Sequence, residues 1–253
     1  QPKYISFSEN RIVIAGDQAI RPSLEIIRST VDEFTFEWSF PGAKATRTKI
    51  GGEVFDVLDI PGFGRIINAG EPALPVFNFM VAVPDGAVPL LSVSDESSIE
   101  YPDFMILPSS GPEPDSYGMN RKEAEADSII YSADSFYPAS PLEIIKTLYL
   151  RGAALAVVQV RPVRFNPVRK TIRVCSRITA TVTFEGQGKS FDRLAGENSA
   201  HFNDYMRNVV INGNCIPEGS VRSSLSPCSD YIIITPTQYK QAADTLAKWK
   251  RQL

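Results

Sequence analysis

The stretch Thr171-Ile-Arg-Val-Cys-Ser-Arg-Ile-Thr-Ala-Thr-Val-Thr-Phe184 decides the fold class, because apolar and polar side chains alternate along it. One face collects the apolar side chains Ile172, Val174, Ile178, Ala180, Val182 and Phe184, and the other collects Thr171, Arg173, Arg177, Thr179, Thr181 and Thr183. Successive side chains of a strand point to opposite sides, so this period of two predicts a β-strand with one buried face. The same alternation places Cys175 on the polar face between two arginines, where we expect an inert surface cysteine.

Two further regions show strand-like patterns around turns. Between Val31 and Phe40 the aromatic side chains fall on alternate positions, which predicts another strand with one face on a core. The run 153–160 is apolar on both faces and leads through the turn 166–170 into the stretch above, which predicts a long hairpin. Phe79 to Val83, the turn Pro84-Asp85-Gly86 and Val88 to Val93 predict another hairpin. Many short strands, with 19 prolines in the chain, favour an antiparallel β-sandwich or jelly-roll over a βαβ fold.

The composition sets the size and the class of the protein. With 253 residues, of which 43% are hydrophobic, the chain can bury a full core as one large domain, or one domain plus a fragment. The net charge of -3 and the mixing of acidic and basic residues argue against nucleic acid as a partner. No apolar run approaches the roughly 20 residues of a membrane-spanning helix, and the amino end lacks the pattern of a signal peptide, which leaves open that one was removed.

The segment from Pro108 to Asp127 differs from its surroundings. It opens with prolines, serines and a glycine that cannot sustain a strand ladder, and Arg121, Lys122, Glu123 and Glu125 follow as a charged tip. We expect an exposed loop here. A loop of this length inside a compact domain often carries a function, although a disordered insertion explains the composition equally well.

The carboxyl-terminal region predicts a change of architecture. Residues 200–210 have helical spacing, and residues 212–229 are polar and rich in Gly, Ser and Pro, which is typical of a linker. Asp230 to Ile234 is predicted to be a buried strand of the parallel type, and Thr235-Pro236-Thr237-Gln238 is predicted to cap a helix that follows at once. We therefore expect a β-sandwich domain at 1–211, a linker at 212–229, and the first strand and helix of an α/β domain at 230–253.

That last helix carries an apolar face formed by Tyr239, Ala242, Ala243, Leu246, Trp249 and Leu253. Nothing else in the sequence is obviously built to receive this face. The pattern indicates a partner, either the rest of a longer polypeptide after cleavage or a second chain.

The cysteines and the single histidine do not form a recognisable catalytic or metal-binding pattern. Cys215 and Cys228 flank a loop-like stretch, so a disulfide between them and two free thiols both remain open. The three cysteines lack zinc spacing, and neither a metal nor a cofactor is expected. His201 has no cysteine nearby in the sequence and is expected at the surface.

Several short motifs, taken in order, resemble the prodomains of the gingipain family. They are Gly70-Glu71-Pro72-Ala73-Leu74-Pro75-Val76, the turn Val83-Pro84-Asp85-Gly86, the tetrapeptide Ser135-Phe136-Tyr137-Pro138, and the hairpin that includes Arg161-Pro162-Val163-Arg164-Phe165-Asn166-Pro167. The resemblance covers roughly Gly70 to Asn212. Tyr231 to Leu253 is similar to the opening strand and helix of the family's caspase-like catalytic domain.

The resemblance implies a zymogen of a bacterial cysteine endopeptidase that is secreted or held at the cell surface. Its prodomain would assist folding, block the active-site cleft of the catalytic domain of the same polypeptide or its cleaved remainder, and be removed by proteolysis. In related prodomains a basic residue on a loop fills the specificity pocket, which points to Arg121 or Lys122 here. Arg222 lies in the predicted linker and is the candidate processing site. No complete catalytic site is expected in this chain, because none of its cysteines lies where the family's nucleophile is expected.

Two alternatives from other classes remain. A secreted structural or adhesive β-sandwich module would use the proline-rich loop as a spacer or ligand contact. An enzyme with its own site would need clustered His, Cys or carboxylate residues, which the sequence does not show.

Overall fold

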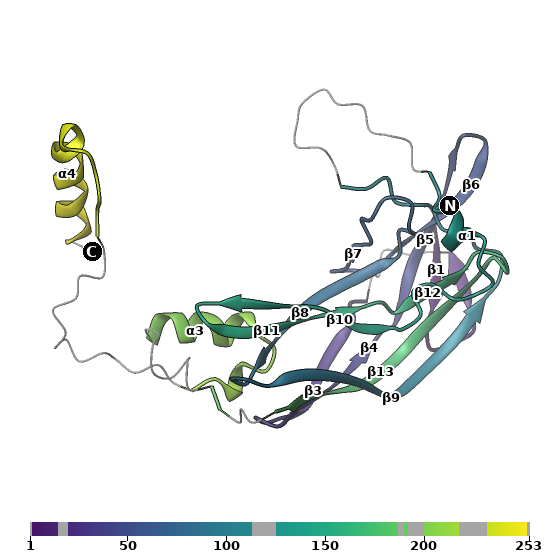
Figure 1. Cartoon of the computed structure of the whole chain (residues 1–253). Coiled ribbons are helices and arrows are strands. Elements are labelled where there is room, and N and C mark those ends of the chain that lie inside the picture. The colour runs from purple at the N-terminus through teal and green to yellow at the C-terminus, as the bar shows by residue number, and fades with distance from the viewer. Residues whose placement is uncertain are drawn as a thin grey trace. The chain divides into compact units, whose positions relative to one another are not determined.

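The computed structural model describes residues 2–14, 20–112, 125–186, 190–191, 200–217 and 232–251. The chain forms two compact units, Gln1–Ser220 and Val221–Leu253, and each is described here by itself (Figure 1). The first unit carries all of the described strands, and the second contains a short helical segment.

The first unit contains strands and a few short helices. Its strands are β1 (Lys3–Ser6), β2 (Ile12–Ile14), β3 (Ser23–Ser29), β4 (Glu33–Ser39), β5 (Gly42–Ile50), β6 (Glu53–Asp59), β7 (Gly64–Arg65), β8 (Pro75–Val83), β9 (Val88–Tyr101), β10 (Leu142–Leu150), β11 (Ala153–Val160), β12 (Val163–Asn166) and β13 (Thr171–Glu185). Its helices are α1 (Ser128–Tyr131), α3 (Ala200–Val209) and the short 3-10 helix η1 (Gly213–Cys215).

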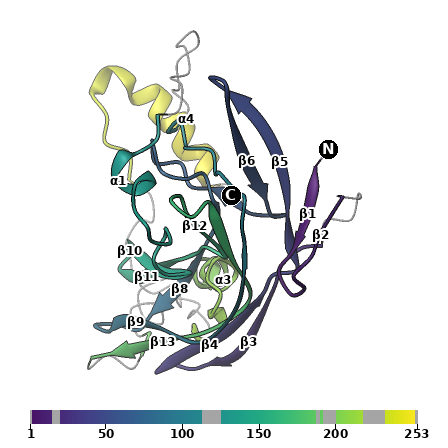
Figure 2. The same ribbon diagram turned by 90° about the vertical axis from the view of Figure 1, so that its right-hand side faces the viewer.

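The strands form three antiparallel sheets. In the first sheet β13 is central, with β9 along one edge and β4 and β12 along the other, and β3 extends the sheet beyond β4. The second sheet has the order β10-β11-β8-β7 and the third the order β2-β1-β5-β6. Figure 2 shows the third sheet extending away from α3, with the β5–β6 hairpin projecting at its end.

The core lies between the first two sheets and is rich in aromatic rings. Along β4 the residues alternate between buried and half-buried, as the sequence predicts. Phe36 of β4 meets Phe79 of β8 edge to face with ring centroids 5.3 Å apart, and Trp38 meets Phe77 at 5.5 Å. Rings from facing sheets thus interdigitate, which confirms the predicted antiparallel sandwich.

The outer side of the second sheet is covered by α3. Met206 and Val210 pack with Leu155 of β11 and Ala82 of β8 in a second apolar cluster, to which Ile216 also belongs. Within this sheet β11 is therefore buried on both faces, which explains why 153–160 is apolar on both faces rather than alternating. The predicted helix at 200–210 is confirmed.

The two predicted hairpins are corrected by the strand pairing. The turn at Pro84 exists, with the Ala87 amide bonded to the Pro84 carbonyl at 3.0 Å, but β8 pairs with β11 and β7, whereas β9 pairs with β13. Likewise β11 stays in the second sheet, and only β12 forms the hairpin with β13. In both places the chain crosses from one sheet to the other. Local turn chemistry specifies the turn but not the sheet that each flanking strand joins.

The packed part of the first unit continues past residue 211, where the sequence predicts that the linker begins. The Asn212 side chain is fully buried, accepts a hydrogen bond from the Ala82 amide at 2.8 Å, and donates one to the Ala82 carbonyl at 2.9 Å. Ile216 is buried as well. The side-chain amide of asparagine carries one donor group and one acceptor group, so it can bond to both backbone groups of a strand residue, as a neighbouring strand would. A polar residue is therefore buried here, and the polar composition of this stretch did not predict that it packs.

The second unit contains η2 (Thr237–Tyr239) and α4 (Lys240–Lys250). Residues 232–234 do not form the predicted strand, since a strand requires a hydrogen-bonded neighbour and the described part of this unit supplies none. The predicted capping box is also wrong, because no side chain caps either helical segment. Tyr239 and Trp249, two members of the predicted apolar face, are exposed, so the described residues of this unit leave that face uncovered, and Ile234 is exposed as well.

Candidate functional site

The candidate site is the pair of chain segments that flank residues 113–124. Arg121 and Lys122, the predicted inhibitory residues, lie outside the described residues, but both flanks are described. We call residues 105–112 the first arm and residues 125–131 the second arm. Both arms are held by side chains and backbone groups of the first unit, as the following contacts show.

A buried aspartate fixes the start of the first arm. Asp56 of β6 is 4% exposed and accepts hydrogen bonds from the Met105 amide at 3.1 Å and from Arg47 Nε at 2.9 Å. Backbone bonds add to this contact, from the Asp56 amide to the Met105 carbonyl at 2.6 Å and from the Leu107 amide to the Asp56 carbonyl at 3.2 Å. A buried carboxylate with a charged partner and an amide donor is well satisfied, so it holds the arm firmly.

The remainder of the first arm pairs with residues 68–73. The Ala73 amide donates to the Leu107 carbonyl at 2.9 Å, and the Ser109 amide donates to the Glu71 carbonyl at 2.7 Å. Glu71 is itself tied down, because its carboxylate accepts a 2.6 Å hydrogen bond from the Tyr137 hydroxyl. Burial, together with this carboxylate, raises the pKa of Tyr137 well above its ordinary value, so the hydroxyl stays a donor at neutral pH.

The second arm is anchored through α1. Asp127 caps this helix by accepting from the Ile129 and Ile130 amides at 2.8 and 3.2 Å. Tyr131, at the other end of the helix, donates from its hydroxyl to the Ile106 carbonyl at 2.9 Å, which joins the second arm to the first. Burial raises the pKa of Tyr131 strongly and keeps this donor protonated.

A groove runs beside the first arm. It has a volume of about 460 Å³ and is lined by residues 107–112 of the first arm, by residues 63–67, and by Asp59 and Ala73. Arg65, which forms an ion pair with Asp59, lies in the wall. The groove thus borders the described chain that leads into residues 113–124.

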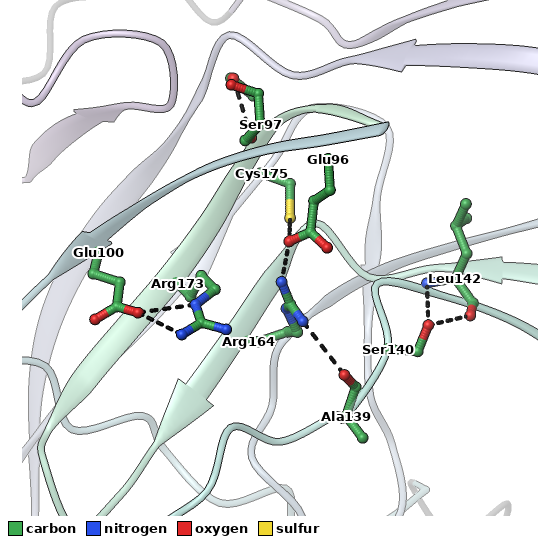
Figure 3. A network of polar contacts seen from close by, with 10 residues as sticks. Glu96, Ser97, Glu100, Ala139, Ser140, Leu142, Arg164, Arg173 and Cys175 are labelled. Carbon is green, nitrogen blue, oxygen red and sulfur yellow. Dashed lines mark hydrogen bonds and ion pairs between the residues drawn. The ribbon is translucent and has the colours of Figure 1, made fainter. Parts of the chain in front are cut away.

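A separate polar network surrounds Cys175 (Figure 3). Arg164 forms an ion pair with Glu96 and donates to the Ala139 carbonyl at 3.3 Å, and the Cys175 thiol donates to Glu96 Oε1 at 3.2 Å. The thiol is fully buried, which corrects the predicted surface position. The ladder shifts register between Cys175 and Arg177, so this β-bulge breaks the strict alternation and buries two successive residues.

We predict that the Cys175 thiol is inert in the folded protein. Burial, followed by the Glu96 carboxylate, raises its pKa to about 12, so the nucleophilic thiolate is scarce at neutral pH. Iodoacetamide at pH 8 should leave Cys175 unmodified in the native state and alkylate it in urea, as peptide mass spectrometry would show. The pKa of the Cys175 thiol is higher in the folded chain than in the unfolded chain, so the protonated thiol favours the folded state. This contribution to the free energy of unfolding should be constant below about pH 8.5 and should fall as the pH rises toward 12. Native labelling as fast as that of the unfolded chain would contradict this prediction.

The other predicted site residues are placed only in part. His201 is exposed on α3, as expected. Cys215 Sγ lies 3.3 Å from the Ser29 hydroxyl, whereas Cys228 and Arg222 lie outside the described residues, so the disulfide and the processing site stay predictions. Among the described residues, no group of three His, Cys, Asp or Glu side chains could hold a metal ion. No helix in the described ranges is long and apolar enough to cross a membrane.

Comparison with known families and proteins gives a consistent result. A family model described as Propeptide_C25 matches residues 17–213. Gingipain R2 of Porphyromonas gingivalis is 25% identical over 210 residues, an alignment that covers 78% of this chain and 27% of the relative. Lys-gingipain of the same species is 23% identical over 159 residues, which are 61% of this chain and 9% of the relative. The chain therefore spans about a quarter or less of the length of these relatives.

Two solved structures share the fold. A chain from the complex of Porphyromonas gingivalis RgpB pro- and mature domains matches with a TM-score of 0.66 and 21% identity, covering 77% of this chain and all of that chain. A chain from a study of the zymogenic latency of gingipain K, from the same bacterium, matches with a TM-score of 0.56 and 20% identity, over 74% of this chain and all of that one.

Proposed function

Because the chain belongs to the Propeptide_C25 family, we propose that its first unit is the inhibitory prodomain of a gingipain-like cysteine peptidase. The peptidase domain of the same polypeptide, or its cleaved remainder, is the proposed partner. The prodomain assists folding of that domain and blocks its active-site cleft until proteolysis removes it. The proposed place of action is outside the cell or at the bacterial surface, as suits a relative of the gingipains.

The observation that carries this proposal is the anchoring of both arms. An inhibitor that enters a protease cleft binds more tightly when its inserted segment is already held in place. Each part of the chain that has to become ordered on binding costs affinity. Here the first arm is tied to Asp56 and to residues 68–73, and the second arm is tied through Asp127 and Tyr131. The segment between them contains Arg121 and Lys122, which we assign to the specificity pocket of the peptidase.

Inhibition in trans tests the proposal. The whole 253-residue chain, added to the separately purified peptidase domain of its parent polypeptide, should inhibit cleavage of a small basic substrate reversibly and with a defined inhibition constant. Bovine serum albumin at equal concentration serves as the control for nonspecific protection. Unchanged cleavage at a large excess of the chain would refute the inhibitory role and favour the adhesive module.

We predict processing after Arg222. The residue lies just past Ser220, the last residue of the first unit, so a cut there separates the prodomain without breaking its core. Maturation of the parent protein should yield a new amino terminus at Ser223, as Edman sequencing would show, and an R222A variant should mature more slowly. A new terminus at any other residue would exclude Arg222 as the processing site.

A further inference from the structure

Gly70 lies between the two arms and bonds to both of them. Its amide donates to the Ser109 carbonyl at 2.8 Å, on the first arm, and its carbonyl accepts from the Asp127 amide at 3.0 Å, on the second arm. One peptide residue thus joins the two ends of the segment that contains residues 113–124. Asp127 also caps α1, so the hydrogen bond that its amide donates joins Gly70 to the start of this helix.

The side of Gly70 that faces the second arm has no room for a side chain. A Cβ atom added at this position would lie 3.1 Å from the Glu125 carbonyl oxygen and 3.1 Å from the Asp127 amide nitrogen. Both atoms are backbone, so the second arm would have to move by a few tenths of an ångström. The residue also has φ +83°, a conformation that other residues rarely adopt. The position therefore combines two independent requirements for glycine.

We propose that Gly70 is a positioning residue for inhibition, which sets the separation of the two arms at which the prodomain meets the peptidase. The inference rests on the proposed function. A loop whose ends are already fixed loses less conformational freedom on binding than one whose ends move independently. It also explains why the Gly-Glu-Pro-Ala-Leu-Pro motif begins with glycine: Gly70 spaces the arms, and Glu71 pairs with Ser109.

A second glycine with a similar positive φ, but with open space where a side chain would lie, provides a matched control. Gly86, in the turn between β8 and β9, has φ +75°, and an added Cβ would meet nothing within 4 Å. G70A and G86A should therefore lose similar stability through the backbone. Only G70A should displace the second arm.

The experiment compares the two variants as whole chains in two assays. In the inhibition assay, G70A should raise the inhibition constant about tenfold or more, while G86A stays within about twofold of the unsubstituted chain. In hydrogen exchange, the Asp127 amide should exchange about tenfold faster in G70A and remain unchanged in G86A. Thermal unfolding of each variant confirms that it is folded before either assay is interpreted.

The two assays separate failure of this inference from failure of the proposed function. Equal Asp127 exchange in the two variants would overturn the role of Gly70, whether or not the chain inhibits. Faster exchange in G70A with an unchanged inhibition constant would also overturn it, since positioning would not matter for binding. If the unsubstituted chain does not inhibit at all, the proposed function fails, and with it the role of Gly70 in inhibition.

Discussion

Replacing Arg121 and Lys122 together by alanine should raise the inhibition constant of the chain about 100-fold or more. The proposed contact places a cationic side chain in the specificity pocket of the peptidase, where hydrogen bonds to a charged group contribute about 1.5–3 kcal/mol each. Two such bonds lost correspond to about two to four orders of magnitude in affinity. The measurement is inhibition of the parent's peptidase domain by the purified 253-residue chain, and the single variants R121A and K122A identify which residue enters the pocket.

The chain offers a matched control in a second Arg-Lys pair. Arg169 and Lys170 lie in the turn between β12 and β13, and Arg169 forms an exposed ion pair with Asp134. R169A/K170A removes the same charges as R121A/K122A but should leave the inhibition constant within about twofold, since an exposed pair contributes little. Equal inhibition by the two double variants would show that neither Arg121 nor Lys122 occupies the pocket.

The substitution F36A should destabilise the first unit by about 3–5 kcal/mol. Phe36 is fully buried, stacks on Phe34 with centroids 5.3 Å apart, and meets Phe79 of the opposite sheet. Its removal leaves a cavity between the two sheets and eliminates one of the aromatic contacts that join them. Urea unfolding followed by circular dichroism would show the loss as a lower midpoint with an unchanged slope.

A neighbouring residue on the same strand serves as the control for F36A. Thr35 points to the other side of β4 and shares a 2.9 Å hydrogen bond with Thr181 across the strand pair. T35A should cost less than about 1 kcal/mol, because the removed contact is a half-buried cross-strand pair. Similar losses in the two variants would mean that the aromatic layer does not dominate the stability of this unit.

Side-chain patterns predicted the most regular strands but not their partners, and they gave no prediction for β1, β2, β3, β5, β6, β7 or β10. The alternation in β4 and β13 identified both strands and their buried faces, because the period of two is a local property. The turn at Pro84 was also correct, yet β8 and β9 separate into different sheets. Which sheet a strand joins depends on apolar surfaces far away in the chain, and these cannot be read from the turn.

The sequence predicted where the candidate site lies in the chain but not the contacts that hold it. Proline, glycine and charge indicated a loop from Pro108, whereas nothing in the sequence joined Asp56 to Met105 or Gly70 to Asp127. Cys175 was predicted at the surface because strict alternation describes a regular strand. A β-bulge next to Cys175 interrupts the alternation, and the Arg164 side chain pairs with Glu96 beside the thiol. The motif from Gly70 to Val76 carried the family resemblance, and its contacts with both arms became visible only in the structure.

The hydrogen bonds between the Asn212 side chain and Ala82 bear on how the proposed prodomain would be released from its peptidase domain. Because the chain is packed through Ile216, the tether to the second unit starts near Pro217 rather than at the end of α3. About 15 peptide steps separate Pro217 from Ile232, which gives a reach of at most about 50 Å. If the proposed prodomain is joined to its peptidase domain through this stretch, the covalent connection would hold the two at an effective concentration of roughly millimolar, and even a weak inhibitor would stay bound. Cutting the tether after Arg222 would remove that advantage at once, and dilution alone would then dissociate the inhibitor without any change in its contacts.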